Sequence, residues 1–382
     1  MKHENISRSY CFSGWQLFTL FLIIHLSTYP LAMANMASPI VKGTIMIEPF
    51  IAHNVEIKKE DIFINLDKNF EKASYHIHYD LNVSSKGNDV PMLFYAPEYS
   101  DTFSVFLDGK PIALQQFDDY HKEYVAIEQY FSPSLFENSD SAVNIKIPIG
   151  VKSEEQEISP SVLKFFRLNL DKANHIIDIY YTAKPYVDKR EWVKTYIFRY
   201  ALSPAKYWKS FENLNIYLDA TAFSPDISTN IVAETFSGDI QKKAEWSMHN
   251  LPTEDMILIS YKPEIPSLAQ LLIRISPLGF ALMLSVVLIL LHFFAIAKYR
   301  QKNRNGLLWI KLLGILGIPL VAYISLWYFY ELIYSIIGTH AAKMQGYGLV
   351  FAIVLVPLAI IIYAIIASVW DYYCSHKYKD KV

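Results

Sequence analysis

Three long apolar stretches between Leu268 and Trp370 constrain this chain more than any other feature of its sequence. Residues 275–297 contain no Asp, Glu, Lys or Arg. At a rise of about 1.5 Å per residue, a helix of that length crosses the ~30 Å hydrocarbon core of a bilayer. We predict three transmembrane helices, because a backbone in lipid must satisfy its own hydrogen bonds. They cover residues 268–297, 307–337 and 347–370.

Charge around the first two stretches predicts their orientation. The connecting loop with Lys311 carries five basic residues and no acidic one, namely Lys298, Arg300, Lys302, Arg304 and Lys311. Basic loops remain in the cytoplasm during membrane insertion. We therefore expect the preceding residues to be exported, and residues 371–382 to form a cytoplasmic tail.

The N-terminus has the pattern of a secretory signal. Lys2 and Arg8 precede an apolar run over residues 15–26, and Ala32-Met33-Ala34 follows. This pattern predicts a signal peptide over residues 1–34, with an uncleaved signal anchor as the alternative. Both leave the next segment exported. We favour an integral protein of a bacterial inner or plasma membrane, with residues 35–266 periplasmic or extracellular and the C-terminus cytoplasmic.

The exported segment is acidic and contains no cysteine. Residues 35–268 hold 23 Lys and Arg against 33 Asp and Glu, a formal charge of −10. This balance argues against nucleic-acid binding, which requires basic surface. Cys11 lies in the predicted signal and Cys374 in the predicted tail, so no disulfide is expected in the exported segment.

Short alternating runs predict that the exported segment is mainly β. In residues 75–83, Tyr75, Ile77 and Tyr79 fall on one face and His76 and His78 on the other, as in a half-buried strand. Similar runs cover residues 57–66, 90–95, 103–107, 143–149, 176–182, 193–200, 214–218 and 256–261. Asp108-Gly109 is typical of a tight hairpin.

These strands predict an antiparallel β-sandwich type of fold. Its length favours two β-domains, over residues 35–151 and 158–262, divided near the polar run at residues 152–157. A single elaborated sandwich is the alternative. The full expectation is a mainly β exported region followed by a bundle of three transmembrane helices.

His76, His78 and Asp80 form the pattern that most resembles a metal site. Alternation places the three side chains on one face of a strand, where two imidazoles and a carboxylate are suitable ligands for a transition metal. No further ligand lies at a recognised spacing. An exposed polar strand face explains the same residues.

Two other residues are candidates for function. Trp208 belongs to an aromatic cluster at residues 196–211 that otherwise fits a sandwich core, and it is the member expected to face a ligand. Glu331 is the acidic residue within a predicted span, and such residues often have functional roles. No nucleophile-elbow, zinc-protease or phosphate-loop motif is present, so we predict no catalytic residue and no cofactor, and the prediction leans away from an enzyme.

Three hypotheses of function remain open. The leading one is a membrane-anchored cell-envelope protein whose β region binds or scaffolds an external protein or glycan. Its three helices would anchor it and could pair with another membrane protein. The second is an accessory subunit of a membrane transport or signalling complex, with Glu331 in a helix interface. The third is an exported enzyme whose active site combines distant residues. All three include the lipid bilayer as a partner, and none includes nucleic acid.

Overall fold

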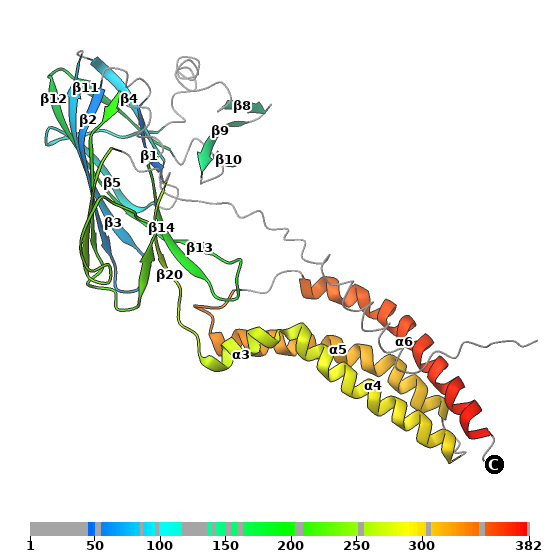
Figure 1. Cartoon of the computed structure of the whole chain (residues 1–382). Coiled ribbons are helices and arrows are strands. Elements are labelled where there is room, and N and C mark those ends of the chain that lie inside the picture. The colour runs from blue at the N-terminus through cyan, green and yellow to red at the C-terminus, as the bar shows by residue number, and fades with distance from the viewer. Residues whose placement is uncertain are drawn as a thin grey trace, which may run out of the picture. The chain divides into compact units, whose positions relative to one another are not determined.

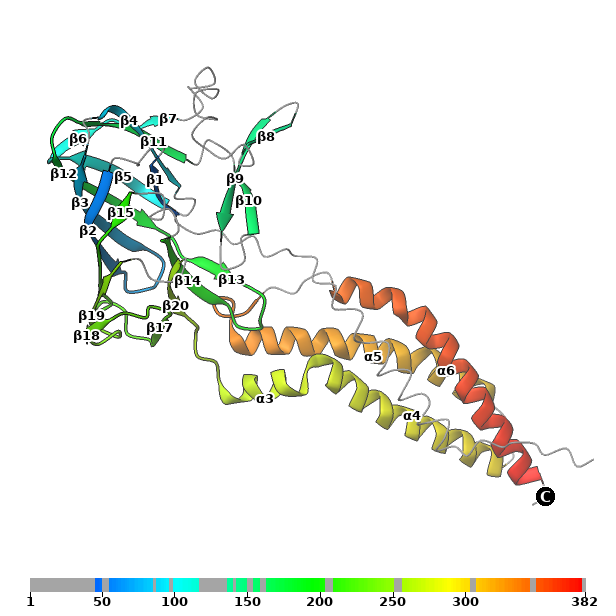
Figure 2. The same cartoon turned by 45° about the horizontal axis from the view of Figure 1, so that its top comes forward.

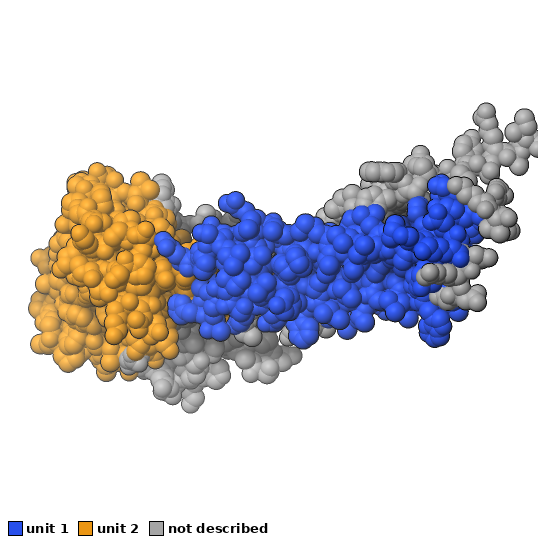
Figure 3. Space-filling view, turned by 90° about the horizontal axis from the view of Figure 1, so that it is seen from below, with its two compact units in different colours: residues 1–38, 264–382 blue, residues 39–263 orange. Residues whose placement is uncertain are grey.

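The computed structural model describes most of the chain and divides it into two compact units (Figure 3). Residues 39–263 form one unit, here called the β region, and residues 264–382 form the helical region. The described residues are 45–49, 55–84, 87–95, 99–116, 136–139, 142–149, 154–158, 163–202, 209–250, 256–302, 307–343 and 348–379. The predicted signal peptide lies outside them.

A nine-stranded sheet is the largest element of the β region (Figure 1). Its strand order is β18-β19-β16-β2-β3-β12-β5-β6, with β15 also paired to β2. Neighbouring strands are antiparallel, except that β15 and β16 run parallel to β2. The bounds are β2 Val55–Leu66, β3 Ala73–Val83, β5 Tyr99–Leu107, β6 Lys110–Ile112, β12 Asn174–Ala183, β15 Ser210–Phe211, β16 Asn213–Asp219, β18 Thr235–Gly238 and β19 Lys243–His249.

Smaller sheets complete the β region (Figure 2). Their orders are β13-β14-β20-β17, β1-β4-β11-β7 and β10-β9-β8. The bounds are β1 Ile45–Pro49, β4 Gly87–Tyr95, β7 Gln115–Gln116, β8 Phe136–Ser139, β9 Ala142–Ile149, β10 Glu154–Ile158, β11 Leu163–Leu170, β13 Tyr186–Asp188, β14 Thr195–Ala201, β17 Ile227–Thr229 and β20 Met256–Tyr261.

One hydrophobic core joins the large sheet to the two four-stranded sheets. Every second residue of β3 is buried, from Ala73 to Val83, because side chains alternate between the two faces of a strand. Phe166 from β11 and Phe198 from β14 belong to the same buried cluster. The β-sandwich type of fold predicted from the sequence is therefore confirmed.

The large sheet combines strands from both sides of the predicted domain boundary. β2, β3 and β5 come from the N-terminal half, and β12, β16 and β19 from the C-terminal half. In the described residues, the polar run at 152–157 therefore does not divide the strands between separate sheets. The division into two β-domains, and the single elaborated sandwich as its alternative, both stay predictions.

The helical region contains three helices long and apolar enough to cross a membrane. They are α4 Pro277–Gln301, α5 Leu307–Ile337 and α6 Gly348–Lys379. A shorter helix, α3 Ser267–Ile275, precedes α4. The predicted three-helix arrangement is confirmed, with one difference: the first predicted span is divided at Ser276, which separates α3 from α4.

Polar side chains hold the three long helices together. His292 Nε2 donates to the Ile310 carbonyl oxygen over 3.1 Å, so its Nδ1 accepts from the Tyr363 hydroxyl at 2.6 Å. These bonds join α4 to α5 and to α6. A β-carbon on Gly314 would lie 2.2 Å from the His292 ring, and only glycine permits this approach.

The carboxylate of Asp371 joins the same three helices at a second level. Arg300 of α4 donates to its two oxygens over 2.7 and 2.9 Å, and Lys311 of α5 donates over 3.0 Å. Asp371 is 6% exposed, so this buried charge is balanced by two cations. The basic residues that predict the orientation therefore also link the helices.

Candidate metal-binding site

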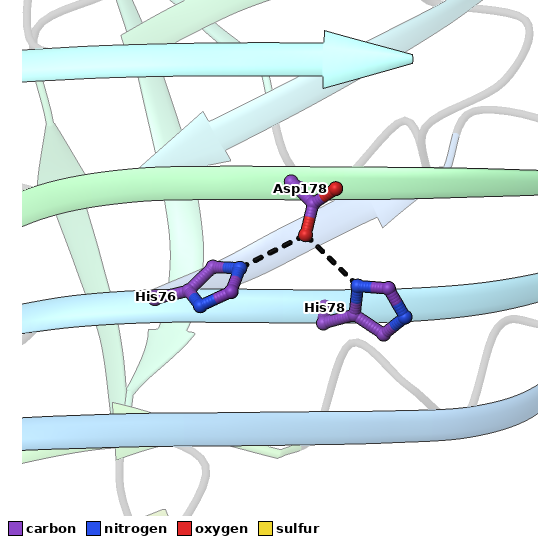
Figure 4. Close-up of side chains that lie close together, drawn as sticks. All are labelled: His76, His78 and Asp178. Carbon is purple, nitrogen blue, oxygen red and sulfur yellow. Dashed lines mark hydrogen bonds and ion pairs between the residues drawn. The ribbon is translucent and has the colours of Figure 1, made fainter. Parts of the chain in front are cut away.

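His76, His78 and Asp178 converge on the outer face of the nine-stranded sheet (Figure 4). His76 and His78 belong to β3, where the hydrophobic alternation that buries Tyr75, Ile77 and Tyr79 turns both imidazoles outward. Asp178 belongs to the neighbouring strand β12, where the same alternation turns it to the same face. The three side chains therefore come from two hydrogen-bonded strands with fixed spacing.

The register of β3 and β12 determines how closely the groups meet. Asp178 pairs directly with His78, and Tyr180 pairs with His76. Asp178 Oδ1 accepts from His78 Nδ1 at 2.8 Å and, diagonally, from His76 Nε2 at 2.9 Å. One ligand atom from each residue lies within 4.8 Å of the other two. Ligand atoms at this spacing can coordinate one metal ion together.

Aromatic neighbours hold the His76 ring in place. Tyr180 stacks on one side with ring centroids 4.2 Å apart, and Phe63 stacks with centroids 5.2 Å apart. Phe63 in turn stacks on Tyr217 at 4.6 Å. The four residues form a row across β16, β2, β3 and β12. A ring fixed in this way keeps its nitrogen directed along the sheet toward Asp178.

The two inner rings of this aromatic row are stacked on both faces. Phe63 lies between Tyr217 and His76, and His76 lies between Phe63 and Tyr180. The inner two rings therefore present their edges outward, whereas sugar stacking requires an open ring face. The stacking therefore supports the imidazole of His76.

Asp80, which the sequence predicts as a third ligand, lies beside the group formed by His76, His78 and Asp178. It lies next to His78 on the same face, with Oδ1 3.4 Å from His78 Nε2, on the side of the ring opposite to Nδ1. Metal-bound histidines commonly present their second nitrogen to a carboxylate, which orients the ring. This geometry suits Asp80 for orienting His78, and its role as a ligand stays a prediction.

The site is partly open to solvent. The exposed fractions of the side chains are 31% for His76, 26% for His78 and 20% for Asp178. Partial burial raises the pKa of Asp178, but the hydrogen bonds from His76 and His78 outweigh that effect and hold the pKa below its usual value. Asp178 is thus an anionic acceptor between two imidazoles, with solvent on one side.

A second aspartate and histidine pair provides a contrast. Asp108, in the β5–β6 turn, accepts from Lys172 Nζ at 2.8 Å, from His175 Nδ1 at 3.1 Å and from the Ile176 backbone N–H at 3.0 Å. His175 Nε2 accepts from the Lys172 backbone N–H, so both of its nitrogens are occupied. Burial raises the pKa of Asp108, and these bonds lower it to about 2 overall. This cluster closes a turn, and both nitrogens of its imidazole already take part in hydrogen bonds.

The other predicted site residues are Trp208 and Glu331. Trp208 lies outside the described residues. Glu331 is exposed on α5, near the C-terminal end of that helix, and its role in a helix interface stays a prediction. Asp178 was missed because no motif connects it to β3. Its only sequence signal is an outward position in an alternating strand, which many residues share.

The chain matches no known family, and no curated protein is similar to it in sequence. A Legionella pneumophila protein for which nutrient binding has been proposed has a TM-score of 0.38 and 10% identity, covering 83% of this chain and 98% of that one. An M1 zinc metallopeptidase from Deinococcus radiodurans has a TM-score of 0.26 and 8% identity, over 54% of this chain and 42% of that one. Leukotriene A4 hydrolase from Saccharomyces cerevisiae has a TM-score of 0.30 and 9% identity, over 61% and 33%. Likenesses of this size support no functional argument.

Proposed function

We propose that this chain is a membrane-anchored protein whose exported β region binds a first-row transition-metal ion, such as Zn²⁺, at His76, His78 and Asp178. The observation that carries the proposal is the convergence of two imidazole nitrogens and one carboxylate oxygen from adjacent strands. This mixed donor set suits zinc and its neighbours, whereas calcium and magnesium prefer oxygen ligands alone.

The open side of the site supports reversible binding. Three protein ligands leave at least one position of a four-coordinate ion for water or for a group from a partner. Closed structural zinc sites use four protein ligands instead. The proposed role is therefore capture or presentation of an ion at the envelope surface.

The proposed location rests on the helices and on charge. Three helices long and apolar enough to cross a membrane fit an anchor in a lipid bilayer. The basic loop with Lys298 and Arg300 supports a cytoplasmic position for that end of α4. A short linker and α3 connect the β region to the other end of α4, so the β region belongs on the opposite side, in the periplasm or outside the cell.

Calorimetric titration of the full-length protein in lipid nanodiscs tests the proposal. We expect one Zn²⁺ per chain, and we expect His76→Ala and Asp178→Asn each to weaken the affinity on the order of 100-fold or more. Ca²⁺ should give no comparable heat. The control is His249→Ala, which removes an exposed imidazole from β19 and should leave the affinity unchanged. Absence of Zn²⁺ binding, or binding that survives both site variants, would overturn the proposal.

A further inference from the structure

Helix α3 has an apolar side and a narrow polar stripe. Ser267, Gln270 and Arg274 recur at positions i, i+3 and i+7 and therefore lie on one stripe of the nine-residue helix. Leu268, Leu271 and Ile275 recur at the same spacing on the adjoining stripe. A short helix with this division is strongly amphipathic.

The leucine stripe of α3 is exposed in the folded chain. Leu268 is 55% exposed and Leu271 is 54% exposed, whereas Ala269, on the other side of the helix, is fully buried. α3 therefore packs through its Ala269 side and presents two large apolar side chains outward. Exposed leucines adjoining a membrane helix point to lipid as the surrounding medium.

Ser276 and Pro277 make α3 a helix of its own. Proline disfavours a helical conformation in the residue before it, and Ser276 has φ 62° and ψ 152°, outside the helical region. Its hydroxyl oxygen accepts from the Gly279 backbone N–H at 3.0 Å and caps α4. The chain therefore changes direction between α3 and α4 (Figure 2).

α3 is too short to cross a membrane. Nine residues extend about 14 Å, roughly half the thickness of the hydrocarbon core. The chain continues from α3 directly into α4, which also exposes apolar side chains: Met283 and Val287 are each 52% exposed. When α4 crosses the bilayer, its exposed apolar side chains face the lipid acyl chains. Leu268 and Leu271 of α3, just before α4, then lie at the surface of the leaflet that the start of α4 enters.

We propose that α3 is an interfacial helix that lies along the bilayer surface, with Leu268 and Leu271 inserted among the acyl chains. Gln270 and Arg274 face the water and the lipid phosphates, which suits a guanidinium group. The partner of this surface is the lipid leaflet. The inference is independent of the metal site.

Fluorescence quenching in reconstituted vesicles distinguishes lipid from water at single positions of α3. Leu271→Cys and Gln270→Cys, each in a chain with Cys11 and Cys374 replaced by alanine, are labelled with bimane and reconstituted in phosphatidylcholine. These positions are adjacent in sequence and both exposed, so they form a matched pair. We expect brominated acyl chains to quench the label at position 271 several-fold more than iodide, and the reverse at position 270.

Two results would overturn the inference. Stronger quenching by iodide than by brominated lipid at position 271 would place the stripe in water. Protection from both quenchers at position 271 would show that protein covers it, either another copy of the chain or a different membrane protein. Circular dichroism of both labelled variants checks that the helices have formed.

Discussion

Asp178 lies directly across from His78 on the neighbouring strand, although 100 residues separate them in sequence, and its Oδ1 is 2.8 Å from His78 Nδ1. The same oxygen also meets His76 Nε2 at 2.9 Å. Asp80, only two residues from His78, lies on the far side of that imidazole. The carboxylate that is distant in sequence, Asp178, therefore contacts both imidazoles, whereas the one nearby in sequence, Asp80, lies beside His78 alone.

The different positions of Asp178 and Asp80 predict different effects on Zn²⁺ affinity when each is replaced by asparagine. Asp178→Asn removes a ligand, and Asp80→Asn removes only a group that orients His78. We expect Asp80→Asn to weaken Zn²⁺ affinity by about 10- to 100-fold, the usual effect of such an outer group. Asp178→Asn should weaken it further. Titration calorimetry on both variants measures the two losses of Zn²⁺ affinity. A larger loss with Asp80→Asn than with Asp178→Asn would indicate that Asp80 is the ligand.

Zinc binding should also stabilise the fold. An ion that binds only the folded state adds about 2.7 kcal/mol when its free concentration is 100 times the dissociation constant. We expect the thermal unfolding midpoint of the β region to rise with Zn²⁺ in the unsubstituted protein. The midpoint of His76→Ala should not change at the same Zn²⁺ concentration. Equal shifts in both proteins would indicate binding elsewhere.

Glu60 predicts that the stability of the β region depends on pH. Its side chain is fully buried, because an extra residue at Lys58 shifts the alternation of β2 and turns Glu60 into the core. The Tyr200 hydroxyl donates to Glu60 Oε1 at 2.8 Å. Burial raises the pKa of Glu60 to about 7, against the lowering effect of hydrogen bonds from Tyr200 and Tyr79.

The direction of the effect follows from proton binding. Between its ordinary pKa of 4.5 and about 7, Glu60 holds a proton in the folded state and not in the unfolded state. Its contribution to stability is therefore complete below pH 4.5 and is lost as the pH rises to about 7. The loss is about 3 kcal/mol in total. Glu60→Gln should remove this slope in unfolding measurements from pH 4.5 to 8, whereas Glu71→Gln, an exposed control, should retain it.

Gly314 and Gly317 give a matched test of helix packing. A β-carbon at Gly314 would collide with the His292 ring, whereas one at Gly317 meets nothing within 4 Å. We expect Gly314→Ala to destabilise the helical region by about 1–3 kcal/mol, the usual cost of overpacking. Gly317→Ala should be neutral or slightly stabilising, because alanine favours helix. Thermal unfolding in one detergent measures both, and equal midpoints would contradict the packing of α4 against α5.

The proposed orientation predicts which residues an impermeant reagent reaches. Ser237→Cys lies in the exposed edge strand β18 of the β region, and Gln301→Cys lies at the exposed end of α4, beside the basic loop. In intact spheroplasts, a charged maleimide should label position 237 at once. It should label position 301 only after lysis. Labelling of position 301 before lysis would reverse the orientation.

Much of the fold could be predicted from local patterns. Every strand expected from an alternating run is present, and Asp108 and Gly109 form the predicted hairpin turn with positive φ angles. Among the described strands of seven residues or more, β11 and β19 have no predicted run, and several shorter strands also have none. β11 carries Arg167 among its apolar residues, and β19 contains Lys243 and Glu245, so alternation in these strands is diluted by charge. The aromatic cluster was interpreted correctly as core for Phe198, Tyr200 and Phe211, which are buried.

Pairing between distant strands could not be predicted in the same way. A single strand shows which side chains share a face, and this was enough to bring His76 and His78 together. Which strand lies next to β3 depends on how the whole sandwich assembles. The contacts of Asp178 and Tyr180 with the two histidines therefore could not be predicted from the sequence. The burial of Glu60 depends on a bulge at Lys58, whose effect appears only in the register with β3.

X-ray absorption spectroscopy of the zinc-loaded, full-length protein tests the central claim most directly. The account predicts two imidazole nitrogens and at least one carboxylate oxygen at about 2.0–2.2 Å from one bound zinc ion. It also predicts that the imidazole scattering falls by half in His76→Ala. A spectrum without imidazole scattering, or one unchanged in His76→Ala, would contradict a metal site on this face of the sheet.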